Sequence, residues 1–121
     1  MIIGAQSIIY STDAEAEADH AFLRDVMGFP DVDAGGGWLM FGLPPAELAV
    51  HPSDTNNVHE FYLMCDDIDG FIGDMKVQQV DCSSITEEPW GRVVEITSPG
   101  GGDLDVYQPL HPRPPSVDTG A

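Results

Sequence analysis

Basic residues are scarce in this sequence. Its 121 residues include only four lysines and arginines against 21 aspartates and glutamates, which gives a formal net charge of −17 at pH 7. A surface with this much negative charge repels nucleic-acid phosphates and anionic lipid headgroups. We therefore expect neither a nucleic-acid partner nor a membrane-surface role. Two interpretations remain open: an acidic surface adapted to high salt, and a face that attracts a basic partner. The acids are spread along the chain rather than massed in a tail, which favours the first.

Long apolar runs are also missing. No stretch approaches the roughly 20 residues that cross a bilayer, and residues 1–4 lack the basic and apolar segments of a signal peptide. We therefore expect a cytoplasmic protein. The two cysteines, Cys65 and Cys82, have no CxxC spacing and lie in apolar, strand-like contexts. They are expected to be small core residues of a single domain rather than a disulfide or a metal site.

The first half of the chain predicts a strand and a helix followed by three strands. The expected elements are a strand at residues 6–11, a helix from about residue 12 to residue 27, and strands at 31–33, 38–42 and 47–51. Thr12 and Glu15 have the spacing of a capping box at the start of the helix. Gly28 is its expected end, because a residue without Cβ turns left-handed at low cost.

The second half repeats this order. The expected elements are a strand at residues 59–65, a helix at about 69–78, and strand segments at 80–84, 91–97 and 104–108. Asp67 lies in a turn rich in N-cap residues. The offset between the halves is nearly constant, since residue 60 corresponds to residue 6 and residue 105 to residue 49. One internal duplication indicates a pseudo-symmetric domain rather than a solenoid.

Short strings in both halves resemble the vicinal oxygen chelate superfamily, which includes glyoxalases, extradiol dioxygenases and bleomycin-resistance proteins. They are SIIYSTD (7–13) with LRDVMGF (23–29), and FYLMCDDID (61–69) with PGGGDLDVYQP (99–109). The resemblance covers about residues 4–110 and implies a single domain, at residues 1–110, with an α+β fold. It implies two βαβββ modules, at about 4–52 and 58–110, which form a cupped mixed sheet, and it implies a homodimer. The remaining residues, 111–121, are expected to be a flexible Pro-rich tail.

The same resemblance implies metal ligands on the inner face of the cup. By position these are Gln6, Glu60 and Asp105, while Ala49 leaves the fourth ligand position vacant. Glu60 and Asp105 are also the implied catalytic residues, each a ligand or a general base. Amide and carboxylate oxygens suit magnesium, manganese or calcium, whereas the iron extradiol enzymes use two histidines and one carboxylate. A divalent ion (Mn, Mg, Fe, Zn or Ni) is implied; the alternative is a metal-free pocket whose polar groups bond one another and water.

Strand alternation places these groups beside aromatic residues on a shared inner face, and leaves the opposite, apolar faces to pack beneath the helices. The residues expected to line the pocket are Tyr10, Trp38, Met40, His51, Tyr62 and Tyr107. The alternative for His51 is a polar residue at a strand end. For the other five the alternative is plain core, which is the favoured interpretation of Trp38 and Met40.

Three functions follow as hypotheses. The first is a metal-dependent lyase, isomerase or dioxygenase acting on a small oxygen-rich substrate. The second is a metal-free protein of the bleomycin-resistance kind, whose acidic and aromatic cavity would sequester a cationic drug. The third is a structural or regulatory module with a vestigial cavity. The fold alone does not choose among them, because function depends on the site.

Overall fold

The computed structural model describes residues 6–9, 12–36, 39–47, 49, 52, 54 and 59–115. In chain order the elements are α1 (Asp13–Ala21), the π-helical turn η1 (Phe22–Val26), β1 (Asp31–Asp33), β2 (Leu39–Phe41), β3 (Tyr62–Met64), α2 (Ile68–Val77), β4 (Thr86–Glu88), β5 (Gly91–Thr97) and β6 (Asp103–Pro109). The fold is α+β, as the sequence predicts. No helix in this described part of the chain is long and apolar enough to cross a membrane.

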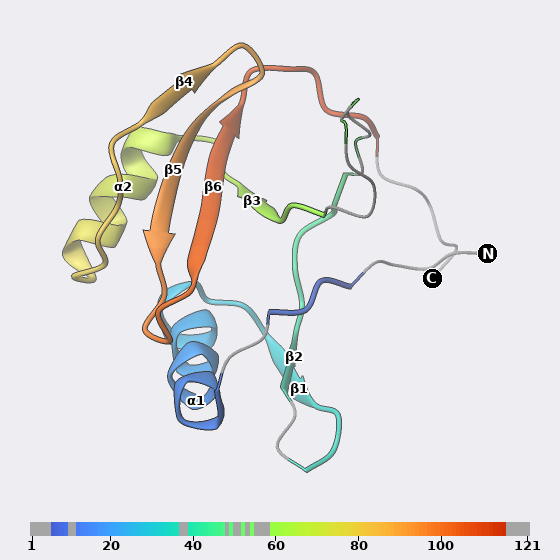
Figure 1. The fold of residues 1–121 in the computed structure, drawn as a ribbon, viewed down its shortest axis with the longest axis vertical. Helices are drawn as coiled ribbons and strands as arrows, with labels where there is room; N and C mark the ends of the chain where they lie inside the picture. Colours follow the sequence, from blue (N-terminus) through green and yellow to red (C-terminus); the bar gives the residue numbers. More distant parts are fainter. Residues whose placement is uncertain are drawn as a thin grey trace.

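The strands form two separate sheets (Figure 1). One is a four-stranded sheet in the order β3-β6-β5-β4, in which β3 runs parallel to β6 and the other pairs are antiparallel. The other is the antiparallel pair of β1 and β2. The four-stranded sheet is therefore mixed, and its strands all come from the second half of the chain.

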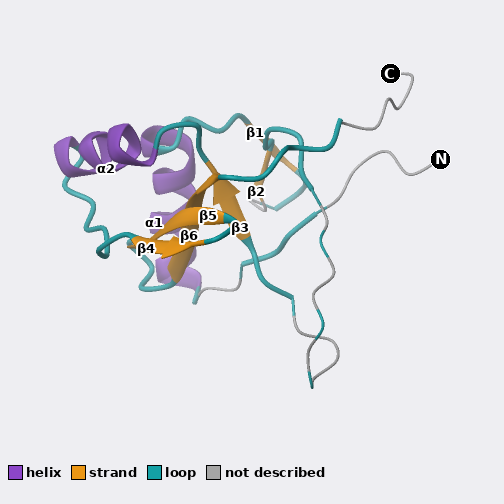
Figure 2. Ribbon diagram, turned by 90° about the horizontal axis from the view of Figure 1, so that it is seen from above, coloured by secondary structure: helices purple, strands orange, loops and turns teal. Residues whose placement is uncertain are grey.

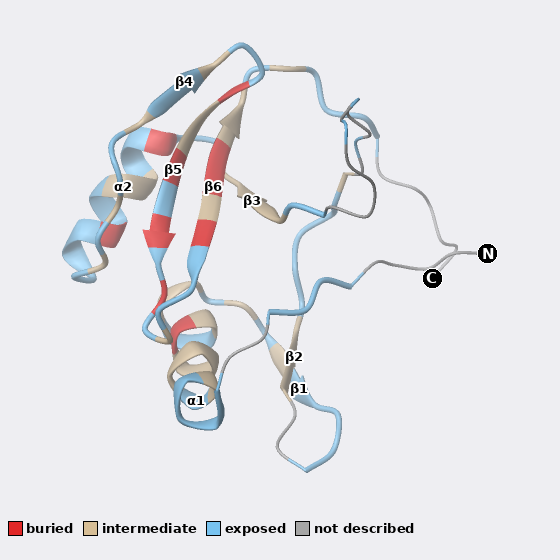
Figure 3. Cartoon of the chain, in the orientation of Figure 1, coloured by how far each residue is buried: buried red, intermediate tan, exposed pale blue. Residues whose placement is uncertain are grey.

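The hydrophobic core lies against one face of the four-stranded sheet. Alternate residues of β5 and β6 point to this face and are buried (Figure 3), and η1 and α2 each contribute a buried side chain. The buried members of the cluster are Phe22, Ile68, Val94, Ile96, Leu104 and Val106. Phe22 comes from η1 and Ile68 from α2, so both helical segments cover the same face; Figure 2 shows α2 to one side of the sheet. Burying each such side chain contributes about 1.5–3 kcal/mol to stability.

The first helix begins and ends near the predicted residues. Thr12 is its N-cap, although its side chain makes no capping hydrogen bond, so only the position of the capping box is confirmed. After Ala21 the helix widens into η1, and Gly28 then takes the left-handed conformation with φ 75°, as predicted. Asp19 accepts a hydrogen bond from the backbone N–H of Gly100 (2.9 Å), which attaches α1 to the turn between β5 and β6.

The second helix is capped by two side chains. Asp67 accepts a hydrogen bond from the backbone N–H of Gly70 (3.1 Å), as its N-cap position predicts. Gln108 on β6 accepts one from the backbone N–H of Ile68 (2.9 Å). Two of the otherwise unpaired N–H groups of the first turn are thus satisfied, one of them by the sheet that the helix covers.

Several expected strands differ from those observed. The strand at residues 6–11 is wrong for residues 6–9, where Ile8 and Ile9 are about half exposed (52% and 48%); residues 10 and 11 lie outside the described residues. Glu47 and Ala49 belong to no strand. Apolar, β-branched composition favours a strand only where a partner strand pairs with it.

Two further differences lie in the second half. Of the strand expected at residues 80–84, only an isolated bridge between Cys82 and Ile96 forms. The acidic strand β4, Thr86–Glu88, was not expected, since Glu is uncommon in strands. It is an edge strand with two exposed residues, where charge is tolerated and discourages pairing with other chains. The repetition of two complete βαβββ modules stays a prediction.

Candidate functional site

The face of the four-stranded sheet opposite the core carries three of the predicted site residues, Tyr62, Asp105 and Tyr107. In the strand register Tyr62 lies beside Asp105, which lies beside Glu95. Two residues farther along both strands, Met64 pairs with Tyr107. Directly paired residues share a face, so the alternation predicted from the sequence is confirmed for β3 and β6.

Three aromatic rings on this face form a cluster that we call the aromatic cluster: Tyr62, Trp90 and Tyr107. Their centroids lie 5.9 Å (Tyr62–Trp90), 5.6 Å (Tyr62–Tyr107) and 5.2 Å (Trp90–Tyr107) apart. Every pair meets edge to face, the arrangement that aromatic quadrupoles favour. Tyr107 is buried at 9% exposure, while Trp90 keeps 39% of its surface exposed. The cluster therefore presents an aromatic surface in which Trp90 is exposed, Tyr62 is partly buried and Tyr107 is buried.

Carboxylates adjoin the aromatic cluster. The Tyr62 hydroxyl donates a hydrogen bond to Oε2 of Glu60 (2.9 Å). Burial, together with this bond and the charge of Glu60, raises the pKa of Tyr62 to about 12. Burial and the negative charges of Glu60 and Asp103 raise the pKa of the Asp105 carboxyl. The negative charge of Asp105 is thus disfavoured both by partial desolvation and by the neighbouring carboxylates.

The chain after β6 closes one side of the cluster. His111 donates from Nδ1 to the carbonyl oxygen of Pro112 (2.9 Å), so in the neutral imidazole Nε2 accepts from the Tyr107 hydroxyl (3.2 Å). Arg113 then pairs with Glu47, with 2.9 Å between Nε and Oε1. Burial and the charge of Glu47 raise the pKa of Tyr107, and Arg113 opposes them.

Of the predicted metal ligands, Glu60 and Asp105 lie near each other, while the side-chain hydrogen bond of Gln6 goes to another residue. Gln6 is exposed and donates from Nε2 to the sulfur of Met40 (3.0 Å), and no hydrogen bond of the described chain links it to Glu60 or Asp105. Among the residues that the structure describes, no three histidine, cysteine, aspartate or glutamate side chains form a group able to hold a metal ion. Ca²⁺ takes six to eight oxygen ligands, whereas Mg²⁺ keeps several waters and is held by one or two carboxylates. The ligand roles of Gln6, Glu60 and Asp105, and the catalytic roles of Glu60 and Asp105, therefore stay predictions.

The predicted pocket-lining residues divide into three groups. Tyr62 and Tyr107 meet in the aromatic cluster. Met40 lies on β2 instead, beside a groove of about 350 Å³ that is lined by Pro30, Asp31, Val32, Met40, Phe41 and Gly42. Tyr10, Trp38 and His51 lie outside the described residues.

Three residues at this face were not predicted to belong to the site. They are Trp90, in the turn before β5; Glu47, in a loop of the first half; and His111, after β6. A tryptophan directly before the glycine that begins a strand was the one available signal, since a bulky ring beside Gly91 can lie across the neighbouring strand.

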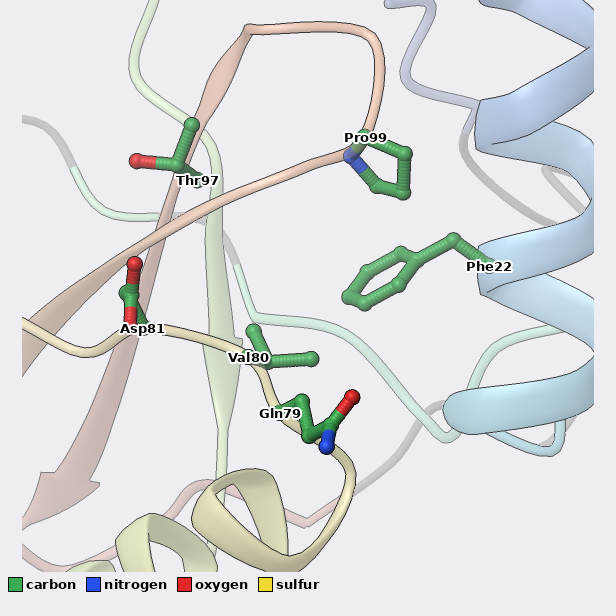
Figure 4. Close-up of a pocket in the computed structure, with 6 residues that line it drawn as sticks. All are labelled: Phe22, Gln79, Val80, Asp81, Thr97 and Pro99. Carbon is green, nitrogen blue, oxygen red and sulfur yellow. The ribbon is translucent and has the colours of Figure 1, made fainter.

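A second groove lies away from this face (Figure 4). Its volume is about 240 Å³, and it is lined by Phe22, Gln79, Val80, Asp81, Thr97 and Pro99. The Phe22 ring projects from the helix toward Val80, and Phe22 is only 4% exposed because it belongs to the core. The groove contains none of the predicted site residues, so the aromatic cluster is the candidate site.

Comparison with known proteins gives matches in structure. No protein-family model matches the chain, and no curated protein matches it in sequence. Among solved structures, TnmS3, an antibiotic-binding protein from Streptomyces sp. CB03234, has a TM-score of 0.60 and 20% identity, over 87% of this chain and 99% of that one. A lactoylglutathione lyase from Agrobacterium tumefaciens has a TM-score of 0.54 and 19% identity, over 83% and 88%. A member of the glyoxalase/bleomycin resistance protein/dioxygenase superfamily from Sphaerobacter thermophilus DSM 20745 has a TM-score of 0.57 and 18% identity, over 89% and 97%.

Proposed function

Since the chain has the fold of the glyoxalase/bleomycin-resistance/dioxygenase superfamily, we propose that it is a small-molecule-binding protein whose ligand is a flat aromatic cation. The observation that carries the proposal is the edge-to-face contact of Tyr62, Trp90 and Tyr107 beside Glu60 and Asp105. Aromatic faces attract cations through the ring quadrupole, and carboxylates on the same face add Coulomb attraction. An accessible indole among fixed rings also offers apolar area to a flat ligand.

The charge of the site supports a cationic ligand rather than an anionic one. Burial and the neighbouring carboxylates raise the pKa of Asp105, so ionised Asp105 is destabilised in the free protein. A bound cation would relieve that repulsion, whereas an anion would increase it. The likeness to TnmS3, which is an antibiotic-binding protein, is consistent with a binding role.

Isothermal titration calorimetry tests the proposal with a matched pair of probes, benzamidine and benzamide. The two molecules have nearly the same shape, but benzamidine carries a planar cation and benzamide is neutral. After chelator treatment of the protein, we expect benzamidine to bind about tenfold more tightly than benzamide, the size of one cation–π contact with electrostatic support.

Two variants locate the binding. Trp90→Leu should abolish measurable binding, and Glu60→Gln should weaken it severalfold. Glu17→Gln is the matched control, because it removes the same charge from an exposed position on α1. Thermal unfolding of each variant separates a lost site from a lost fold. Equal affinities for the two probes, or an unchanged affinity in a folded Trp90→Leu variant, would contradict the proposal.

A metal-dependent enzyme on a small oxygen-rich substrate is the second candidate. One observation favours it: Glu60 lies near enough to Asp105 to raise the pKa of that carboxyl. Two neighbouring carboxylates can contribute to a site for a hard cation. Elemental analysis of protein purified without chelator, beside Glu60→Ala, distinguishes the candidates; a near-stoichiometric divalent metal that the variant loses would favour the enzyme. Assembly into a homodimer stays a prediction, which light scattering during size-exclusion chromatography tests.

A further inference from the structure

The segment after β6 contains a cationic side chain, Arg113, which lies at the edge of the candidate site. Arg113 pairs with Glu47 (2.9 Å between Nε and Oε1), and its Nη2 donates to the carbonyl oxygen of Pro45 (3.3 Å). In Figure 1 the red chain that follows β6 runs past the segment that follows β2. The side chain of Glu47 is only 14% exposed, against 48% for Arg113. A largely buried carboxylate is thus neutralised by a guanidinium that is half in solvent.

The same segment is fixed to the aromatic cluster. His111, two residues before Arg113, accepts the hydrogen bond of the Tyr107 hydroxyl (3.2 Å), and the two rings lie 6.2 Å apart. Glu47 raises the pKa of Tyr107 and Arg113 lowers it, so both charges act on that hydroxyl. Glu47 therefore lies close to the proposed binding surface, although it belongs to the other half of the chain.

The other two arginines form ion pairs in other parts of the structure. Arg24 pairs with its sequence neighbour Asp25. Arg92 pairs with Asp69 on α2 and Glu87 on β4. Arg113 is thus distinguished among the arginines by a pairing that spans 66 positions of sequence and reaches the candidate site.

We propose that Arg113 is an internal counter-ion of the binding site, and that a cationic ligand binds by replacing it on Glu47. The inference rests on the proposed function and narrows the ligand: a flat aromatic body packs against the aromatic cluster, and a planar amidine or guanidine group projects from it to the carboxylate. A planar cation of this kind reproduces the paired N–H donors that Arg113 offers to Glu47. Glu47 is then a residue that determines specificity, because it selects for the projecting cation.

Calorimetric titration with benzamidine on the full chain tests the exchange. Arg113→Gln should bind benzamidine about three- to fivefold more tightly than the unmodified protein, since a partly exposed ion pair no longer has to be broken. Glu47→Gln should bind it more weakly and lose most of the preference over benzamide. Arg24→Gln is the matched control: it makes the same change in net charge at a remote pair, and its affinity should equal that of the unmodified protein.

Each result bears on a different claim. Unchanged affinity in Arg113→Gln, or equal tightening in Arg24→Gln, overturns the exchange but leaves the proposed function in place. Failure of all the proteins to prefer benzamidine over benzamide overturns the proposed function itself. Arg113→Lys covers the case in which Glu47→Gln does not fold. It keeps the charge but loses the planar fork, so its affinity should lie between those of the unmodified protein and Arg113→Gln.

Discussion

The ring of Tyr107 lies directly over Gly91. A Cβ atom added at Gly91 would stand 2.6 Å from Cδ2 of that ring and 2.9 Å from the carbonyl oxygen of Gln108. Gly91 begins β5 and pairs with Pro109, two residues along β6 from Tyr107. The absence of a side chain at this one position is what allows the Tyr107 ring to cross the strand and reach Trp90.

Gly91→Ala should therefore destabilise the protein. Backbone atoms and a packed ring form the obstacle, so neither yields easily, and we expect a loss of about 1–3 kcal/mol in the free energy of unfolding. Gly73→Ala on α2 is the control, because nothing lies within 4 Å of its added Cβ, and alanine favours a helix by up to about 1 kcal/mol over glycine. Denaturant unfolding measures both variants. A Gly91→Ala protein as stable as the unmodified one would refute the packing described here.

Asp105→Asn should stabilise the folded protein at neutral pH while weakening benzamidine binding. The pKa of Asp105 is raised above the ordinary 3.8, so folding favours its protonated form. The folded state holds this proton over an interval above 3.8 in which the unfolded state has lost it, so the unmodified protein loses stability as pH rises through that interval. Asp105→Asn removes this loss of stability. The resulting gain in the free energy of unfolding is less than about 1 kcal/mol, because solvent screens the charge of Asp105.

Thermal unfolding at a series of pH values measures this effect. Asp74→Asn, at an exposed position on α2, makes the same change in net charge and is the matched control. A profile of Asp105→Asn that parallels that of the unmodified protein would show that the Asp105 environment does not disfavour its charge.

Much of the second half, and the end of the first helix, could be predicted because the signals in these segments are local. The strand at residues 91–97 is found at Gly91–Thr97, and the cap at Asp67 and the left-handed turn at Gly28 occur where short-range stereochemistry places them. The segment at residues 6–9 has equally good strand composition but forms no strand. Propensity reports how well a residue fits a pleated surface; it does not report whether a partner strand is present.

The candidate site divides along the same line. Tyr62, Asp105 and Tyr107 were predictable because a period of two assigns them to one face. Trp90 reaches the face from a turn, Glu47 from a loop and His111 from the chain after the last strand. None of these three residues lies in a strand whose alternation could assign it to a face. Their contacts depend on how segments that are distant in the sequence pack together.

Salt should raise the melting temperature substantially. The net charge is −17, and self-repulsion among exposed carboxylates opposes the compact state. Raising KCl from about 0.1 M to about 1 M shortens the screening length from about 10 Å to about 3 Å, which removes most of that repulsion. A variant with Glu15, Glu17 and Asp74 changed to their amides should show a smaller rise, because part of the repulsion is already gone. A melting temperature that is independent of KCl would contradict the interpretation of the acidic surface as one suited to high salt.

Tyr62 should ionise about two pH units later than a solvated tyrosine, because its pKa is raised to about 12 from an ordinary 10.0. The folded state retains this proton where the unfolded state has lost it, so the contribution of Tyr62 to stability falls as pH rises from 10.0 to about 12. Ultraviolet absorbance of tyrosinate, as the difference between the unmodified protein and Tyr62→Phe, isolates this one titration. Glu60→Gln should lower the pKa of Tyr62, since the amide keeps an acceptor for the hydroxyl but removes the negative charge that opposes ionisation. A difference titration centred near 10 would mean that Tyr62 is neither desolvated nor bonded to Glu60, and the carboxylate would then lose its place in the proposed binding site.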